Sequence, residues 1–355
     1  MKEKIKQIFK HIFIDGFSGM ALGLFCTLIV GLIIQQLGDV IGGNFGSTLR
    51  QLGTMATITT GAGIGIGVAH KFKAPPLLLY SSAVTGLIGA YAGRINSGAM
   101  FDGSLIVIAG PGDPLGAFIA AMVGYEIGKL IAGKTKLDII LTPIVTIVSG
   151  GLIGLLVGPP ISSFMLRVGE VINWSMGQIP FIMGIVVAVV MGMILTLPIS
   201  SAALAIILSL DGLVAGAATV GCAAQMVGFA VSSYRENKVG GLLAQGLGTS
   251  MLQVPNIMRK PVIWLPPIIT SAILGPLATT VFFMENNAAG AGMGTSGLVG
   301  QLMTWRTMIG NETPGMLLFK ILLLHFILPA LLTLGISEWM RKKQIIKFGD
   351  LQLDT

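Results

Sequence analysis

One acidic residue, Glu312, stands directly before a long apolar stretch, in the sequence Asn311-Glu312-Thr313-Pro314-Gly315. Because proline and glycine interrupt a helix and free backbone groups, a carboxylate at this point can accept hydrogen bonds from a polyol or carry a proton. The amide of Asn311 stands beside it. The alternative is that Glu312 lies in water and caps the helix expected to begin near Pro314. Both interpretations stay open.

A glycine-rich run follows three polar residues in the segment 284–303. Met284-Glu285-Asn286-Asn287 leads into residues 288–300, which contain five glycines. Low-bulk backbone exposes N–H and C=O groups, and together with nearby amides and a carboxylate these can line a solute site. The run lacks the lysine of a nucleotide-binding P-loop, and a flexible outer loop is the alternative. The residues predicted to bind solute here are Glu285, Asn286, Asn287, Gly292, Gly294, Thr295 and Ser296.

Two further residues, Asp113 and His325, are candidates for the same site. Asp113 lies in the turn Gly110-Pro111-Gly112-Asp113-Pro114, where ordinary turn chemistry explains it equally well. His325 lies deep in the apolar stretch that follows Glu312, so it needs a partner or a cavity. The alternative for His325 is a neutral side chain that is hydrogen-bonded to a neighbouring helix.

The composition identifies the kind of protein that must position these residues. Of 355 residues, 53% are hydrophobic and only 10% are charged, whereas soluble domains carry about 25% charged residues. The 50 glycines allow close helix packing in lipid. The formal charge of +7 comes from basic residues at the ends of apolar stretches, which argues against nucleic-acid binding. No catalytic motif and no His/Cys ligand set stands out, so no enzyme activity, metal or cofactor is expected.

The apolar stretches predict an all-α integral membrane protein with about ten transmembrane helices. Three further segments, 96–112, 240–257 and 284–303, are apolar but too broken by glycine and proline to be simple helices, and are predicted to be re-entrant or broken segments. The ten predicted spans are 17–37, 53–69, 74–93, 112–132, 139–158, 179–197, 199–215, 216–233, 261–283 and 315–337.

The basic residues predict the orientation of the chain. Lysines gather at the N-terminus, at Lys2, Lys4 and Lys6, and again near the C-terminus, at Lys342 and Lys343. By the positive-inside rule both termini are expected in the cytoplasm, which agrees with an even number of spans. Similar sequences near 112–160 and 216–283 suggest duplicated helix pairs within one transmembrane domain of residues 1–355, although shared membrane composition is an equal alternative.

The run Ala289-Gly290-Ala291-Gly292-Met293-Gly294-Thr295-Ser296-Gly297-Leu298-Val299-Gly300, together with residues 311–315, resembles the PfoR-type membrane proteins. These are bacterial proteins related to the membrane component (EIIC) of sugar phosphotransferase systems and are often labelled toxin regulators. The resemblance implies a transporter-like domain in the bacterial cell membrane, commonly dimeric, in which broken segments and an acid hold the solute. In fructose-type relatives the acid lies in Thr-Glu-Gly, and Asn311-Glu312-Thr313 departs from that sequence.

These observations predict a permease that binds and translocates a small polar solute, such as a sugar, at a central cavity. The chain shows no soluble phosphorylatable domain, so group translocation would require separate phosphotransferase-system proteins as partners. The other expected partners are membrane lipid and the solute. The alternative is a membrane sensor or regulator that binds a ligand without transporting it. An enzyme acting on lipid-linked substrates lacks a recognisable catalytic set.

Overall fold

The computed structural model describes residues 7–8, 10–103, 105–108 and 110–353. The lysines predicted to orient the N-terminus, Lys2, Lys4 and Lys6, lie outside the described residues. The chain divides into two compact units, Met1–Phe164 and Met165–Asp354. The division falls within the long helix α9 (Asp138–Met176).

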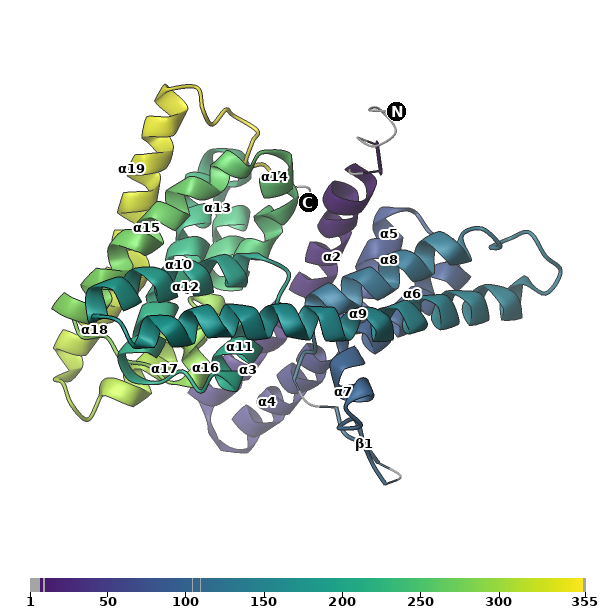
Figure 1. Cartoon of the computed structure of the whole chain (residues 1–355), viewed down its shortest axis with the longest axis horizontal. Helices are drawn as coiled ribbons and strands as arrows, with labels where there is room; N and C mark the ends of the chain where they lie inside the picture. The colour runs from purple at the N-terminus through teal and green to yellow at the C-terminus, as the bar shows by residue number, and fades with distance from the viewer. Residues whose placement is uncertain (1–6, 9, 104, 109, 354–355) are drawn as a thin grey trace. The chain divides into compact units, whose positions relative to one another are not determined.

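The first unit is built mainly from helices, and a long loop joins α8 to α9 (Figure 1). Its first helical stretch, Lys10–Ile41, contains α2 (Phe17–Leu24) and α3 (Val30–Ile41), joined by a π-helical turn. The helices that follow before α9 are α4 (Gly43–Ile58), α5 (Thr60–Lys71), α6 (Pro76–Ala90), α7 (Ala92–Asn96) and α8 (Pro114–Gly128). Two short antiparallel strands, β1 (Phe101–Asp102) and β2 (Leu105–Ile106), form a hairpin before α8.

Alternating glycines in α5 let two helices approach it from opposite sides. A Cβ added at Gly65 would lie 1.9 Å from the Ser82 carbonyl oxygen in α6, and one at Gly67 would lie 2.2 Å from the Gly19 oxygen in α2. Gly61 faces α6 as Gly65 does, whereas Gly63 faces the first helical stretch. This packing agrees with the close helix approach that the glycine content allows in lipid.

The second unit is organised around α12 (Gly212–Ser232). Almost all of this helix is buried, and α10 (Pro180–Thr196), α15 (Leu265–Pro276) and α19 (Leu328–Lys342) pack against it (Figure 1). The remaining helices are α11 (Ser201–Ile207), α13 (Tyr234–Leu243), α14 (Val254–Arg259), α16 (Ala288–Ala291), α17 (Val299–Met308) and α18 (Pro314–Leu322).

Small residues explain how α12 becomes the centre of this unit. A Cβ added at Gly221 would lie 2.0 Å from the Ala188 carbonyl oxygen of α10, and one at Gly216 would lie 1.8 Å from the Met284 oxygen. In lipid, where no hydrophobic force draws helices together, such close backbone contact supplies the van der Waals attraction between them. Glycine is therefore required at both positions.

Five helical stretches in the described part are long and apolar enough to cross a membrane, and the bent pair α4 and α5 provides a sixth if it is counted as one span. Three shorter apolar helices are α6, α8 and α10. The predicted total of ten is not confirmed. The five long stretches are Lys10–Ile41, Asp138–Met176, Gly212–Ser232, Pro261–Val281 and Pro314–Lys342.

One span prediction is wrong. Residues 199–215 were expected to form a span, but they contain the seven-residue helix α11 and a turn before α12. Residues 96–112, expected to be a re-entrant or broken segment, contain the two-residue strands β1 and β2, whose side chains are exposed. A turn signal, Asp211-Gly212, ends the first segment, and Gly103 with its positive φ of 60° permits the hairpin turn in the second.

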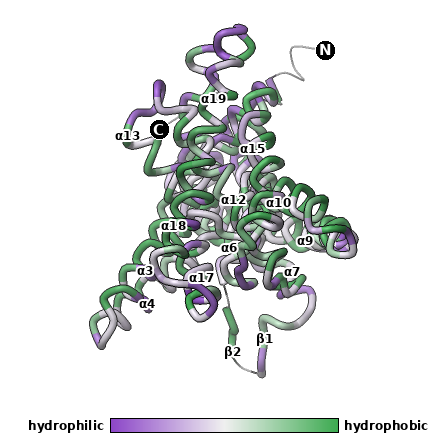
Figure 2. Tube along the Cα trace, turned by 90° about the vertical axis from the view of Figure 1, so that its left-hand side faces the viewer, coloured by the Kyte–Doolittle hydropathy of each residue, from purple (hydrophilic) through white to green (hydrophobic). Residues whose placement is uncertain are grey.

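The outer helix surfaces are apolar. Large side chains such as Leu156 of α9, Phe319 of α18 and Leu331 of α19 are exposed. Figure 2 shows hydrophobic colour over most of the helices, whereas hydrophilic colour gathers at the far end of α19 and in α13. An extended exposed apolar surface is stable in contact with lipid rather than water. The chain is thus a helical membrane protein.

Candidate functional site

Two broken segments meet in the interior of the second unit. The first runs from α13 through a π-helical turn (Ala244–Gly248) and a 3₁₀ turn (Ser250–Gln253) into α14. The second runs from α16 through a 3₁₀ turn (Ser296–Leu298) into α17. The Thr295 hydroxyl of the second donates a hydrogen bond to the Gly246 carbonyl of the first. The breaks predicted for 240–257 and 284–303 are therefore present, and the two segments are in contact.

The glycines of the second segment allow it to lie directly on neighbouring backbone. Gly294 has a positive φ of 52°, and a Cβ there would lie 2.8 Å from the Cys222 carbonyl carbon of α12. A Cβ at Gly292 would lie 2.3 Å from the Ser201 oxygen of α11, whose hydroxyl donates to the Gly292 carbonyl at 2.6 Å. Thr295 is fully buried and Ser296 nearly so. The run is thus a packed interior element, not a flexible outer loop.

Asn286 and Asn287 fix the entry to this segment. The Asn286 amide is fully buried, donates to the Thr219 hydroxyl at 2.7 Å and to the Gly300 carbonyl at 3.1 Å, and accepts the Asn287 N–H. The Asn287 side chain caps α16 by accepting from two backbone N–H groups, and it donates to Thr307. Both amides are occupied by contacts within the fold.

Three buried polar atoms on residues that follow the glycine-rich run 288–300 have no hydrogen-bond partner among the described residues. They are Oε1 of Gln301 and Oγ1 of Thr304 on α17, and Nε2 of His325. His325 is fully buried in the π-helical turn Leu323–Ile327, and its Nδ1 lies 3.1 Å from Gln301 Nε2. Gln301 and Thr304 are three residues apart, so they share one face of α17.

The tautomer of His325 follows from this contact. Because an amide nitrogen can only donate, the Nδ1 of His325 accepts from Gln301 in this orientation, and the ring proton is on Nε2. The set therefore offers one N–H donor, one carbonyl acceptor and one hydroxyl. Buried polar groups in proteins are almost always paired with protein, water or ligand, so these three atoms are candidates to bind a polar guest. The alternative sequence interpretation, a histidine bonded to a neighbouring helix, also holds at Nδ1.

Glu312 forms an ion pair and does not cap the helix. Its carboxylate contacts the Lys320 ammonium two turns along α18, and both side chains are mostly buried. The residue at the N-cap of α18 is Thr313, without a side-chain capping bond, so the capping interpretation of Glu312 is wrong. The second carboxylate oxygen of Glu312 is buried and has no hydrogen-bond partner within the described part of the chain. Asn311, beside it, is exposed.

The two remaining predicted site residues occupy different surroundings. Glu285 is partly buried, and its backbone N–H donates to the Met308 sulfur at 3.3 Å. Asp113 belongs to the first unit, where it caps α8 by accepting from the Gly116 N–H at 2.9 Å. The other carboxylate oxygen of Asp113 is buried and accepts no hydrogen bond from the residues that the structure describes.

A buried polar network around Gln225 of α12 was not predicted from the sequence. The Gln225 carbonyl oxygen accepts from the Trp264 indole at 2.8 Å and from the Thr196 hydroxyl at 3.3 Å, and its amide donates to Ser271 at 3.4 Å. Thr196 also bonds Ser250, at 2.8 Å, in the first broken segment. A glutamine inside a predicted span was the only available signal, because its partners are distant in sequence.

A second network that was missed joins the first broken segment to the C-terminal tail. Gln253 donates to Gln245 at 2.8 Å and to the Leu351 carbonyl at 3.0 Å. Asn256 donates to Gln253 and to the Gln352 carbonyl, both at 2.8 Å. The tail therefore covers this end of the broken segment.

Two ion pairs hold the C-terminal tail and the end of α19. Arg341 bonds both carboxylate oxygens of the completely buried Glu236, at 2.9 and 3.1 Å. Asp350 pairs with Lys260 at 2.6 Å. Burial raises the pKa of Asp350, but the hydrogen bonds from Lys260 and from the Lys347 N–H, with the charge of Lys260, outweigh burial and lower it overall.

A family model described as "Phosphotransferase system, EIIC" matches residues 14–353 of the chain. No curated protein matches. The family match covers both units and every predicted site residue. It does not distinguish the PfoR-type proteins from other members, so that part of the resemblance stays a prediction.

Proposed function

Because the chain belongs to the phosphotransferase-system EIIC family, we propose that it is a permease that binds and translocates a small polar solute, such as a sugar. The observation that carries this proposal is the set of buried polar atoms without partners on Gln301, Thr304 and His325. They lie beyond a broken segment, as expected of a transporter site built from discontinuous helices. The family match concerns a transport component and gives no support to the sensor alternative.

The chemistry of the three atoms favours a hydroxylated, uncharged solute. A sugar hydroxyl both donates and accepts, so it can donate to Gln301 Oε1 while it accepts from His325 Nε2–H. The Thr304 hydroxyl serves as either partner. The described side chains of this set carry no fixed charge, so a phosphate or carboxylate ligand would lack a counter-ion there.

The other predicted residues take supporting roles in this proposal. Asn286, Asn287, Gly292, Gly294, Thr295 and Ser296 shape the broken segment and hold it on α12. Glu312 keeps one buried carboxylate oxygen available for a hydroxyl or a proton, whereas its other oxygen is held by Lys320. Asn311, Glu285 and Asp113 stay candidate contacts for a solute that is entering or leaving.

The proposed setting is the bacterial cell membrane, with both termini in the cytoplasm and the chain paired as a homodimer. Group translocation would require separate phosphotransferase-system proteins that phosphorylate the solute as it is released. The basic residues at the end of α19 support a cytoplasmic C-terminus by the positive-inside rule.

Thr304→Val is expected to weaken solute binding without weakening the fold. The Thr304 hydroxyl has no partner among the described residues, so its replacement by a methyl group removes no internal hydrogen bond. For the solute, one lost hydrogen bond corresponds to about 1–3 kcal/mol, or roughly 5- to 150-fold in Kd. A thermal-shift screen of sugars, polyols, amino acids and nucleosides identifies the solute, because a ligand that binds the native state raises Tm. Titration calorimetry then measures the Kd of this solute for the wild type and for Thr304→Val.

The matched control is Ser337→Ala. Ser337 is also buried with an unpartnered hydroxyl, but it lies on α19 away from the set on α17. This variant is expected to bind as the wild type does. Equal affinity in Thr304→Val and the wild type, with both folded, would contradict the proposed site. A screen that finds stabilisation only by charged solutes would contradict the proposed solute class.

A further inference from the structure

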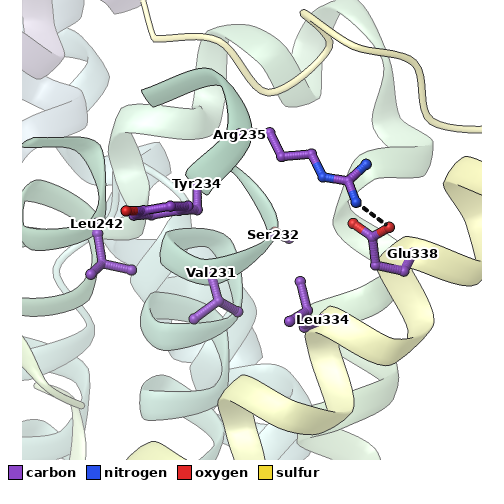
Figure 3. Close-up of a pocket in the computed structure, with 7 residues that line it drawn as sticks. All are labelled: Val231, Ser232, Tyr234, Arg235, Leu242, Leu334 and Glu338. Atoms are coloured by element: carbon purple, nitrogen blue, oxygen red, sulfur yellow. Dashed lines mark hydrogen bonds and ion pairs between the residues drawn. The ribbon is translucent and has the colours of Figure 1, made fainter. Parts of the chain in front are cut away.

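A groove at one end of the second unit is separate from the buried polar site. It has a volume of about 420 Å³ and lies between the end of α12, α13 and α19 (Figure 3). Its residues are Val231, Ser232, Tyr234, Arg235, Leu242, Leu334 and Glu338. The walls are mainly apolar, and the one charged pair of the lining joins Arg235 to Glu338 at 2.8 Å. Figure 3 shows this pair reaching across from α13 to α19 above Leu334.

The residues around the groove are those typical of a membrane–water boundary. Tyr234, in the lining, and Trp339, next to Glu338, are both exposed aromatic side chains. Lys342 and Lys343 follow at the end of α19 and are exposed, as is Lys238 on α13. Aromatic rings prefer the headgroup level of a bilayer, and lysines lie just beyond it. The groove therefore opens at the headgroup level.

We infer that this groove binds a phospholipid with an anionic headgroup. One acyl chain lies along Val231, Leu242 and Leu334, and the lipid phosphate contacts the Arg235 guanidinium. A guanidinium recognises phosphate by paired, charge-assisted hydrogen bonds, and basic pockets between membrane helices recognise anionic lipids in this way. Arg235 is available for this contact because its side chain is 60% exposed even while paired.

Charge around the groove favours an anionic lipid over a zwitterionic one. Lys342 lies one turn beyond Glu338 on α19, so it comes on the same side of the helix. The two positive charges of Lys342 and Arg235 therefore exceed the single negative charge of Glu338. The Glu338 carboxylate competes with the phosphate for Arg235, so the ion pair sets how tightly the lipid is held.

The test is native mass spectrometry of the full chain in detergent, titrated with phosphatidylglycerol. Arg235→Gln is expected to weaken lipid retention about fivefold, which is the usual contribution of one basic residue near an anionic lipid surface. Glu338→Gln is expected to strengthen lipid retention by a similar factor, because it releases Arg235 from its ion pair. The control is Arg50→Gln, which removes an exposed arginine that is likewise paired with a carboxylate, Asp39, in the first unit. It is expected to leave retention unchanged.

Several results would overturn the inference. These are equal retention in Arg235→Gln and the wild type, weaker retention in Glu338→Gln, or equal retention of phosphatidylcholine and phosphatidylglycerol. Displacement of the lipid by millimolar inorganic phosphate would show that the site recognises an anion and not a lipid. Displacement by an acidic soluble protein would assign the groove to a protein partner. The melting temperature of each lipid-free variant verifies that it is folded.

Discussion

Glu236→Gln is expected to destabilise the second unit by about 3–5 kcal/mol, because it leaves the buried Arg341 guanidinium without its counter-ion. The Glu236 side chain is completely buried and that of Arg341 is 7% exposed. Arg341 would retain its hydrogen bond to the Ser232 carbonyl, at 3.0 Å, and could still donate to the new amide oxygen, but it would lose the negative charge that compensates its own. The measurement is chemical unfolding in detergent, followed by tryptophan fluorescence.

The matched control for this prediction is Glu338→Gln. Glu338 forms the other ion pair between α13 and α19, but its partner Arg235 is 60% exposed. Exposed ion pairs contribute about 0–1 kcal/mol, so this variant should unfold almost as the wild type does. Equal destabilisation by the two substitutions would contradict the burial of the Glu236–Arg341 pair. If the Glu236→Gln protein does not fold at all, this result agrees with the prediction only when the Glu338→Gln protein does fold.

Gly221→Ala is expected to destabilise the same unit by about 3 kcal/mol, at the upper end of typical overpacking costs. The added Cβ would lie 2.0 Å from the Ala188 carbonyl oxygen, which is backbone and cannot rotate away. Helices α10 and α12 would have to separate, and the contact between Gln225 of α12 and Thr196 of α10 would lengthen with them. Unfolding in detergent measures the loss.

Gly335→Ala provides the comparison within the same unit. Gly335 lies in α19, and a Cβ there meets nothing within 4 Å. Because alanine favours helix over glycine by roughly 1 kcal/mol, this variant should be as stable as the wild type or more so. A Gly221→Ala protein with wild-type stability would show that α10 and α12 are not in backbone contact.

The sequence predicted the elements of the fold better than their contacts. Low charge and long apolar stretches are sufficient to identify a helical membrane protein. Glycine and proline mark the breaks in 240–257 and 284–303, because these residues weaken helices wherever they lie. The segment 199–215 was predicted wrongly because its apolar residues outweighed the turn signal of Asp211-Gly212.

The polar contacts could not be predicted because they join distant positions. Gln253 and Leu351 are 98 residues apart, and Asn286 and Thr219 are 67 apart. A single amide in an apolar sequence does not indicate its partner. Two signals were nevertheless present. Glu312 directly precedes the apolar stretch that contains Lys320, and Gln301 and Thr304 are three residues apart, which places them on the same helix face.

Exchange of labelled solute in proteoliposomes tests the central claim most directly. Vesicles containing the full chain are loaded with the unlabelled solute that the thermal-shift screen identifies, and entry of labelled solute is followed. We expect saturable entry through the wild type, slower entry through Thr304→Val at subsaturating solute, and wild-type entry through Ser337→Ala. A wild-type protein that binds the solute but gives no entry above empty vesicles would contradict transport.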